Sequence, residues 1–309
     1  MWSIPPIHDA QWLIDQALAQ GRKAAVSKGE EARLEAVGKY VDQYLGDILD
    51  AFPKFDDIDE IYRELATAVT DYPHMRKSLG AVDWSKRKAH HLRLQYRALM
   101  RRMSKKQTHF GKTVPGTHDA QQEVTRKYQG RLCSVLKQID ENLVSLEVAR
   151  KALRRLPELK NAFTVVLFGM PNAGKSTLLG KLTTATPEVQ PYAFTTKSLN
   201  LGYVHGIQFI DTPGVLSRDH ANDIELQAEI AAKHADLICL VLDPSMDDAE
   251  QKRLLVRAKS IAQVLVYVSK TDLYPDTPID GVRSPEELLA AIQPIAAEHV
   301  SVKGKPILS

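Results

Sequence analysis

One octapeptide, Gly169-Met-Pro-Asn-Ala-Gly-Lys-Ser176, limits the folds open to this chain more than any other feature. It follows an apolar run at residues 163–168 and opens a segment whose leucines have helical spacing. Its glycines let backbone N–H groups turn toward an anion, and the start of a helix adds a favourable dipole. Lys175 can neutralise the β- and γ-phosphates of a nucleotide, while the Ser176 hydroxyl can ligate Mg²⁺. The alternative is a strand-to-helix turn without a ligand, which the strand and helix on either side disfavour.

The pattern therefore predicts a phosphate loop at the end of a strand in an α/β domain. The nucleotide-binding residues predicted here are Gly169, Pro171, Asn172, Ala173, Gly174, Lys175, Ser176 and Thr177.

Two further segments have the spacing of nucleotide-sensing switches. Asp211-Thr-Pro-Gly214 ends a β-prone run, where an Asp can support Mg²⁺ and Gly214 can aim its N–H at a γ-phosphate. Between this segment and the loop lies the pair Thr195-Thr196, and a threonine there can bind Mg²⁺ when a γ-phosphate is present. Taken alone, each segment is an ordinary turn or strand start. Together with the loop, they predict a switch.

The tetrapeptide Ser269-Lys-Thr-Asp272 indicates which base is bound. Asp272 can accept hydrogen bonds from both N1–H and the 2-amino group of guanine, a pair of donors that adenine lacks, and the stem of Lys270 can lie along the base. Ser269 stands where such motifs usually have Asn. The motif favours GTP over ATP, with an ATPase as the weaker alternative.

The spacing of apolar residues along the chain changes near residue 160. The first 160 residues have helical apolar spacing, with a basic stretch at 82–106 and one long helix at roughly 119–156. Beyond them, short apolar runs alternate with helical segments, which indicates a mainly parallel sheet covered on both faces. The predicted fold is an all-α helical bundle at 1–160, followed by a Ras-like α/β P-loop GTPase domain at 161–309.

Charge is unevenly distributed along the chain. Residues 76–131 contain fifteen lysines and arginines against three acids, an excess of +12, although the whole chain carries only +3. Such a block indicates a polyanionic partner, while the alternative is a solvated helix face. The candidate RNA-binding residues are Lys86, Arg87, Lys88, Arg93, Arg97, Arg101, Arg102, Lys105 and Lys106.

Composition excludes several classes of protein. The 44% hydrophobic and 26% charged fractions are ordinary for a globular chain, and no apolar run approaches the roughly 20 residues that cross a bilayer. The two cysteines suggest neither a zinc site nor a disulfide framework. We expect a cytoplasmic protein with no membrane or DNA partner.

These motifs together resemble the Obg superfamily of translation-factor-class GTPases, and within it the NOG family of nucleolar-type GTP-binding proteins. The resemblance extends beyond the nucleotide motifs to two groups of segments. In the second half they are Tyr192-Ala-Phe-Thr-Thr-Lys197, Asn222-Asp-Ile-Glu-Leu-Gln-Ala228 and Leu242-Asp-Pro-Ser245; in the first half, Phe52-Pro-Lys-Phe-Asp-Asp57, Tyr62-Arg-Glu-Leu65, Lys77-Ser-Leu-Gly80 and Val135-Leu-Lys-Gln-Ile-Asp140. The short C-terminal end is similar to archaeal members.

The resemblance implies a role in assembly of the large ribosomal subunit, binding of rRNA or subunit precursors, GTP or GDP with Mg²⁺ as cofactors, and a monomer off the ribosome. It assigns catalytic roles to Lys175, Thr196 and Gly214, and metal ligation to Ser176, Thr196 and Asp211. Asn172 occupies the position where related GTPases coordinate K⁺. A tight-turn role for this Asn is the alternative.

Three departures from the family pattern bear on activity. Val215 stands where a Gln would orient the attacking water, so slow intrinsic turnover is expected. Ser269 loses the amide that braces the base. The last guanine-binding loop is not recognisable, because the sequence stops just after Lys305-Pro-Ile-Leu-Ser309; either the chain is a shortened piece or the base pocket is open on one side. An RNA-binding assembly scaffold with a degenerate nucleotide pocket therefore remains the alternative function.

Overall fold

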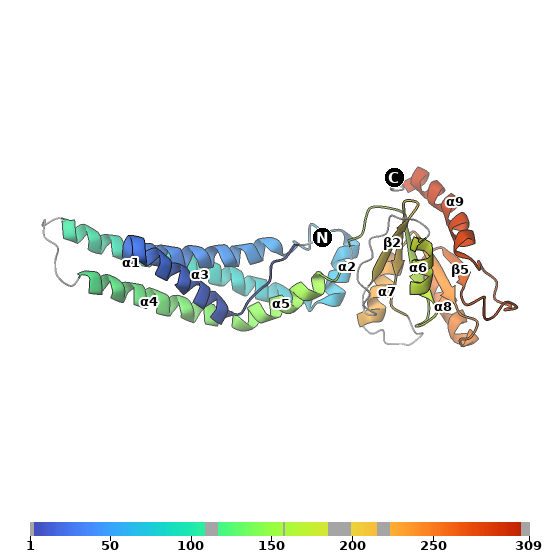
Figure 1. The fold of residues 1–309 in the computed structure, drawn as a ribbon, viewed down its shortest axis with the longest axis horizontal. Helices are drawn as coiled ribbons and strands as arrows, with labels where there is room; N and C mark the ends of the chain where they lie inside the picture. Colours follow the sequence, from blue (N-terminus) through green and yellow to red (C-terminus); the bar gives the residue numbers. More distant parts are fainter. Residues whose placement is uncertain (1–2, 109–116, 157, 185–198, 215–222, 304–309) are drawn as a thin grey trace. The chain divides into compact units, whose positions relative to one another are not determined.

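The computed structural model describes residues 3–108, 117–156, 158–184, 199–214 and 223–303. The chain divides into two compact units. A helical unit comprises Trp2–Ile58 and Thr70–Arg154, and an α/β unit comprises Asp59–Val69 and Arg155–Ser309. In Figure 1 the helical unit runs from blue to green and the α/β unit from yellow to red, with α2 in cyan.

The helical unit is built from α1 (Ala10–Ala51), α3 (Tyr72–Thr108), α4 (Thr117–Lys137) and α5 (Asp140–Leu153), which pack against one another. Within α1 the helix reverses at Gly29, whose φ of 75° and ψ of −169° are not helical. The two arms of this hairpin lie close together: a Cβ added at Gly21 would lie 2.5 Å from Cγ2 of Val37.

The prediction of a single helix at 119–156 is wrong, because the structure has a break between α4 and α5. Ile139 there has φ −106° and ψ 12°. Apolar spacing continues across the break, so the pattern alone concealed it. Asp140 begins α5, where its carboxylate is favoured by the helix dipole, and it accepts a hydrogen bond from the Ala10 N–H at 2.8 Å. The break thus lets α5 hold the first turn of α1.

Among the described residues of the α/β unit, five strands form one sheet in the order β2-β3-β1-β4-β5. They are β1 (Thr164–Phe168), β2 (Asn200–Val204), β3 (Ile207–Asp211), β4 (Leu237–Leu242) and β5 (Val264–Val268). Only β2 runs antiparallel to its neighbour. Four helices of this unit follow the phosphate loop in the chain: α6 (Lys175–Thr184), α7 (Asp223–Lys233), α8 (Asp248–Ile261) and α9 (Pro285–Lys303). The predicted fold class, a helical bundle followed by a P-loop α/β domain, is confirmed.

One helix from the first half of the chain lies in the α/β unit, which differs from the expectation of a single boundary near residue 160. Leu65 and Ala66 of α2 (Glu60–Val69) are buried, and α2 packs against α7. Glu64 pairs with Lys233 at 2.6 Å and with His234 at 3.1 Å, both at the end of α7. The Tyr62 hydroxyl accepts a hydrogen bond from the Leu159 N–H. These contacts join α2 to the α/β unit despite its place in the sequence.

Candidate functional site

Where the phosphate loop leaves β1, its backbone adopts a conformation that requires glycine at position 169. Gly169 has φ 155°, and a Cβ added to it would lie 2.6 Å from the Val241 carbonyl oxygen of β4. A side chain at this position is therefore excluded by both backbone conformation and space. Asn172 has φ 61°, a left-handed conformation that Asn tolerates, so the Asn serves the turn whether or not it also binds K⁺.

Lys175 begins α6 and is buried beneath the loop. Its ammonium donates hydrogen bonds to the carbonyl oxygens of Gly169 at 3.1 Å and Met170 at 2.8 Å. Burial lowers the pKa of Lys175 to about 8, and the nearby Asp211 carboxylate opposes that shift. The loop thus positions a cation whose charge is only partly compensated by the protein, as a site for a polyphosphate requires.

Asp211 ends β3 beside the helix start. Its Oδ2 accepts hydrogen bonds from the Ser176 hydroxyl at 2.6 Å and from the Asn200 amide at 3.3 Å. Its Oδ1 is buried and accepts none from any described residue. Burial raises the pKa of Asp211, and the hydrogen bonds from Ser176 and Asn200 counteract this. A hydroxyl beside a carboxylate with an unsatisfied oxygen is a donor set that fits Mg²⁺.

Asn200 was not among the predicted site residues, although the sequence of the turn that follows it indicates its position. His205 and Gly206 have φ of 47° and 76°, which is the conformation of a two-residue hairpin turn between β2 and β3. Such a turn fixes the register, and in that register Asn200 lies opposite Asp211. Recognising the turn would therefore have placed the Asn200 amide beside the predicted metal-supporting carboxylate.

Gly214 closes the site against the phosphate loop. A Cβ at Gly214 would lie 2.4 Å from both Cα and N of Pro171, so the two backbone segments are in direct contact. Together they bound a cavity of about 470 Å³. The residues that line this cavity are Pro171, Asn172, Gly174, Lys175, Ser176, Thr177, Asn200, Asp211, Thr212, Pro213 and Gly214.

The segment predicted to recognise guanine lies at the end of β5. The Ser269 hydroxyl donates to the Leu242 carbonyl oxygen of β4 at 3.1 Å, and a Cβ at Gly174 would lie 3.3 Å from Cβ of Ser269. Ser269 thus braces the sheet and touches the phosphate loop by packing alone. Lys270 has φ 53° and pairs with Asp243, a residue that carried no predicted role. Asp272 is exposed and does not line the cavity.

Some predicted residues lie outside the described residues. These are Thr196, the expected Mg²⁺ ligand of the first switch, Val215, which replaces the water-orienting Gln, and the terminal segment 305–309.

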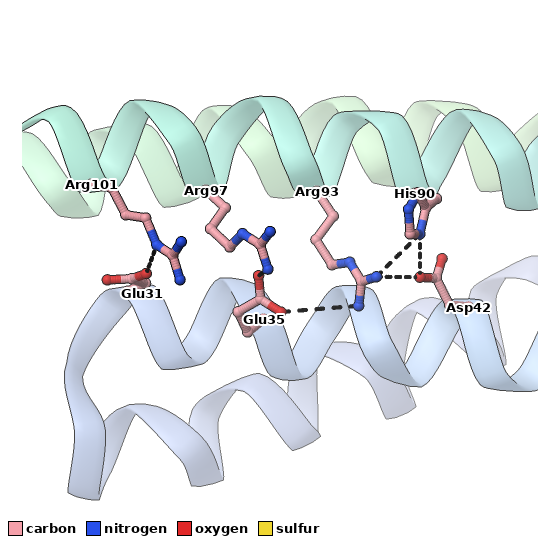
Figure 2. A network of polar contacts seen from close by, with 7 residues as sticks. All are labelled: Glu31, Glu35, Asp42, His90, Arg93, Arg97 and Arg101. Carbon is pink, nitrogen blue, oxygen red and sulfur yellow. Dashed lines mark hydrogen bonds and ion pairs between the residues drawn. The ribbon is translucent and has the colours of Figure 1, made fainter.

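The candidate RNA-binding residues of α3 fall into two sets. Arg93, Arg97 and Arg101 form ion pairs with acids of α1, as Figure 2 shows. Their partners are Asp42 at 2.9 Å, Glu35 at 3.3 Å and Glu31 at 3.1 Å, respectively. Acids of α1 therefore already compensate the charge of this row, and RNA binding by these three arginines stays a prediction.

The other candidates lie elsewhere on α3. Lys86 is half-buried, Arg87 pairs with Asp83 at 2.8 Å, and Lys88 and Arg102 are exposed. The side chains of Lys105 and Lys106 lie outside the described residues. In the described parts of the chain, no helix has the length and apolar character needed to cross a membrane.

Comparison with known families assigns each half of the chain separately. Residues 14–159 match the family described as NOG1 N-terminal helical domain, and residues 164–270 match the family described as 50S ribosome-binding GTPase. The uncharacterized protein MJ1408 of Methanocaldococcus jannaschii is 34% identical over 79% of this chain and 69% of its own length.

Nucleolar GTP-binding protein 1 of Kluyveromyces lactis is 31% identical over 77% of this chain. The match spans only 37% of that fungal protein. Among solved structures, the FeoB G-domain from Methanococcus jannaschii covers 44% of this chain and 97% of its own, with 22% identity and a TM-score of 0.33.

Proposed function

The chain belongs to the NOG family of nucleolar-type GTP-binding proteins, and we propose that it is a GTPase that switches between nucleotide states during assembly of the large ribosomal subunit. One observation carries the nucleotide part of this proposal. Lys175, Ser176 and Asp211 converge on a single cavity, with Asp211 Oδ1 and the Lys175 ammonium both incompletely satisfied by the protein.

Four residues of the cavity have distinct roles in the proposal. Lys175 binds the β- and γ-phosphates, and the N–H groups at the start of α6 share that charge. Ser176 and Asp211 would hold Mg²⁺, with Thr196 as a further ligand in the triphosphate state. The ion would supply neutralisation of charge on the phosphates. Gly214, in contact with Pro171, lies where its segment can respond to a γ-phosphate.

Titration with a fluorescent GDP analogue tests nucleotide binding. Lys175→Ala should weaken binding about 10- to 100-fold, since it removes charge-assisted hydrogen bonds of about 1.5–3 kcal/mol. Lys181→Ala is the matched control, because Lys181 is an exposed lysine of the same helix. Absence of saturable binding by the unmodified protein would refute the proposal.

Hydrolysis is the finer part of the proposal. Val215 cannot orient water, so turnover by the protein alone should be slow and should rise when large ribosomal subunits are added. The second candidate function, a scaffold that turns nothing over, is favoured by one substitution: Ser269 lacks the amide that would brace a base, and its hydroxyl donates to the Leu242 carbonyl oxygen. Single-turnover assays with radiolabelled GTP distinguish the two, because a scaffold releases no phosphate even with subunits present.

The proposed partner is rRNA in precursors of the large subunit, bound by the helical unit. The basic excess in residues 76–131 supports this, as does the family description of residues 164–270 as a ribosome-binding GTPase. Co-sedimentation with large subunits at low salt, and its loss at high salt, is the test. A role for Asn172 in binding K⁺ is also proposed; dissociation constants for GDP that are equal in Na⁺ and K⁺ would reject it.

A further inference from the structure

Helix α3 presents its basic residues on two different faces. One row, formed by His90, Arg93, Arg97 and Arg101, points at α1 and meets Glu31, Glu35 and Asp42 there (Figure 2). Only 12% of the Arg93 side chain and 34% of the Arg97 side chain are exposed. This inner row holds α3 against α1, and its charge is compensated inside the unit.

A second set of residues lies on the side of α3 that no other described helix of the helical unit covers. Its members recur at steps of three, four or seven residues, so they lie along one stripe of the helix. This outer stripe consists of Lys77, Trp84, Lys88, His91, Gln95, Leu99 and Arg102, all exposed. At about 100° per residue, Lys88 of the outer stripe and Arg93 of the inner row point about 140° apart.

No acid among the described residues pairs with the outer stripe. The sequence of residues 72–108 contains a single carboxylate, Asp83, which is paired with Arg87 beside the stripe. None of Lys77, Lys88 and Arg102 has an ion pair to another described residue. With a rise of about 1.5 Å per residue, Lys77 and Arg102 lie about 38 Å apart. The positive charge is therefore carried along the full length of one helix face.

Two apolar side chains lie within this charge: Trp84 is 42% exposed and Leu99 is 43% exposed. They are fifteen positions apart and form no continuous apolar patch, which disfavours a docking surface for a folded protein. Spaced cations with an exposed aromatic ring suit a nucleic acid instead, because phosphates bind Lys and Arg while an unpaired base stacks on Trp.

We propose that the outer stripe of α3 is the face that contacts RNA, and that the inner row is structural. This rests on the proposed RNA-binding function and specifies which basic residues perform it. Lys77, Lys88 and Arg102 bind phosphates, and Trp84 stacks on an unpaired base. Arg93, Arg97 and Arg101 do not contact RNA.

The test compares two double variants of the full chain that remove the same charge. Lys88→Gln/Arg102→Gln alters the outer stripe, and Arg97→Gln/Arg101→Gln alters the inner row. Binding of a fluorescently labelled RNA stem-loop is measured by anisotropy over a range of salt concentrations. The outer variant should lower affinity at least about tenfold and reduce the slope of log K against log salt by about 1.8, at about 0.9 per lost phosphate contact. The inner variant should leave the slope unchanged.

Two single variants guard against an effect of folding. Arg101→Gln and Arg102→Gln alter adjacent exposed residues, and only the second should change the slope. Trp84→Ala should weaken binding of a stem-loop about fivefold or more, through lost stacking, without changing the slope.

The outcomes separate the two claims. If the unmodified protein does not bind RNA at low salt, the proposed RNA-binding function fails. If it binds but the inner and outer variants lose affinity equally, or only the inner variant does, the assignment of the face is overturned. Binding to anionic phospholipid vesicles through the outer stripe, with no binding to RNA, would also overturn it.

Discussion

The Lys270 ammonium lies 2.5 Å from Oδ2 of Asp243, a carboxylate with no exposed surface. The sequence predicted that this Lys would lie along a guanine base and gave Asp243 no role. Burial by itself would raise the pKa of Asp243, but the pairing with Lys270 and the hydrogen bonds from Ser245 lower it. The end of β4 thus holds the Lys of the guanine motif, on the strand to which Ser269 also bonds.

Asp243→Asn tests how much this pair stabilises the α/β unit. Removing a buried carboxylate beside a half-exposed ammonium should lower the free energy of unfolding by about 2 kcal/mol. GDP should also bind less tightly, because Lys270 loses its position. Asp248→Asn is the matched control: Asp248 pairs with Lys252 at 2.6 Å, but both side chains are more than two-thirds exposed. That variant should change stability by less than about 0.5 kcal/mol. Equal effects in urea unfolding would contradict the role of burial.

Gly214→Ala tests the contact between the second switch and the phosphate loop. The added Cβ would overlap the backbone of Pro171, which cannot yield as a flexible side chain would. Strain of about 1–3 kcal/mol should displace one of the two segments and weaken GDP binding about 5- to 100-fold. Gly180→Ala is the control, since a Cβ there meets nothing within 4 Å in α6. It should retain binding and stabilise the helix by up to about 1 kcal/mol.

Lys175 predicts the pH dependence of nucleotide binding. Its pKa in the free protein is about 8, because burial disfavours the charged form. A bound polyphosphate favours the charged form and raises that pKa. Binding should therefore take up a proton above pH 8, and GDP affinity should be constant below pH 8 and fall by up to about tenfold per unit above it. Calorimetry at pH 8.5, in two buffers of different ionisation enthalpy, measures the proton uptake. A value of zero would be incompatible with this prediction.

Glu147 predicts the acid sensitivity of the helical unit. Arg150 donates two hydrogen bonds to Glu147, at 2.6 and 2.8 Å, and the Ile7 N–H donates another at 3.0 Å. Mainly because of Arg150, the pKa of Glu147 falls to about 2. A depressed pKa stabilises the fold above the unfolded value of 4.5, and the stabilisation disappears as the pH falls toward 2. At about 1.4 kcal/mol per pKa unit, this amounts to at most roughly 3 to 4 kcal/mol.

Urea unfolding at pH 6 and pH 3, followed by tryptophan fluorescence, measures this effect. The signal reports on the helical unit alone, because the three tryptophans of the chain, Trp2, Trp12 and Trp84, all belong to it. Glu147→Gln should destabilise the unit at pH 6 and flatten its pH dependence. Glu141→Gln, at an exposed position of the same helix, should behave as the unmodified protein. A pH dependence that persists in Glu147→Gln would assign the effect to other carboxylates.

The sequence predicts most directly the placement of residues that belong to one continuous motif. The structure brings Lys175, Ser176, Asp211 and Gly214 to one cavity, since each motif sits at the carboxyl end of a strand that the apolar pattern also indicates. The two residues that were not predicted, Asn200 and Asp243, make their contacts through pairing between separate strands. Asn200 reaches Asp211 through the register of a hairpin, and Asp243 reaches Lys270 across two parallel strands.

A count of charged residues along the sequence also leaves out pairing between helices. The excess of Lys and Arg in residues 76–131 says nothing about which of them the preceding helix neutralises. The acids Glu31, Glu35 and Asp42 lie outside the counted stretch, so the count does not distinguish the paired Arg93, Arg97 and Arg101 from the unpaired Lys88 among the described residues. Only the packing of α3 on α1 separates the two sets.

The membership of α2 in the α/β unit limits how these two parts can be exchanged as modules. A recombination point near residue 155 would separate Glu64, Leu65 and Ala66 from α7 and uncover the end of that helix. A transferable nucleotide-binding module must therefore carry residues 59–69 as well as the chain from 155 onward. Substitutions on α2 and α7 should accordingly be inherited together, as those in a single domain are, although Glu64 and Lys233 are 169 positions apart in the chain.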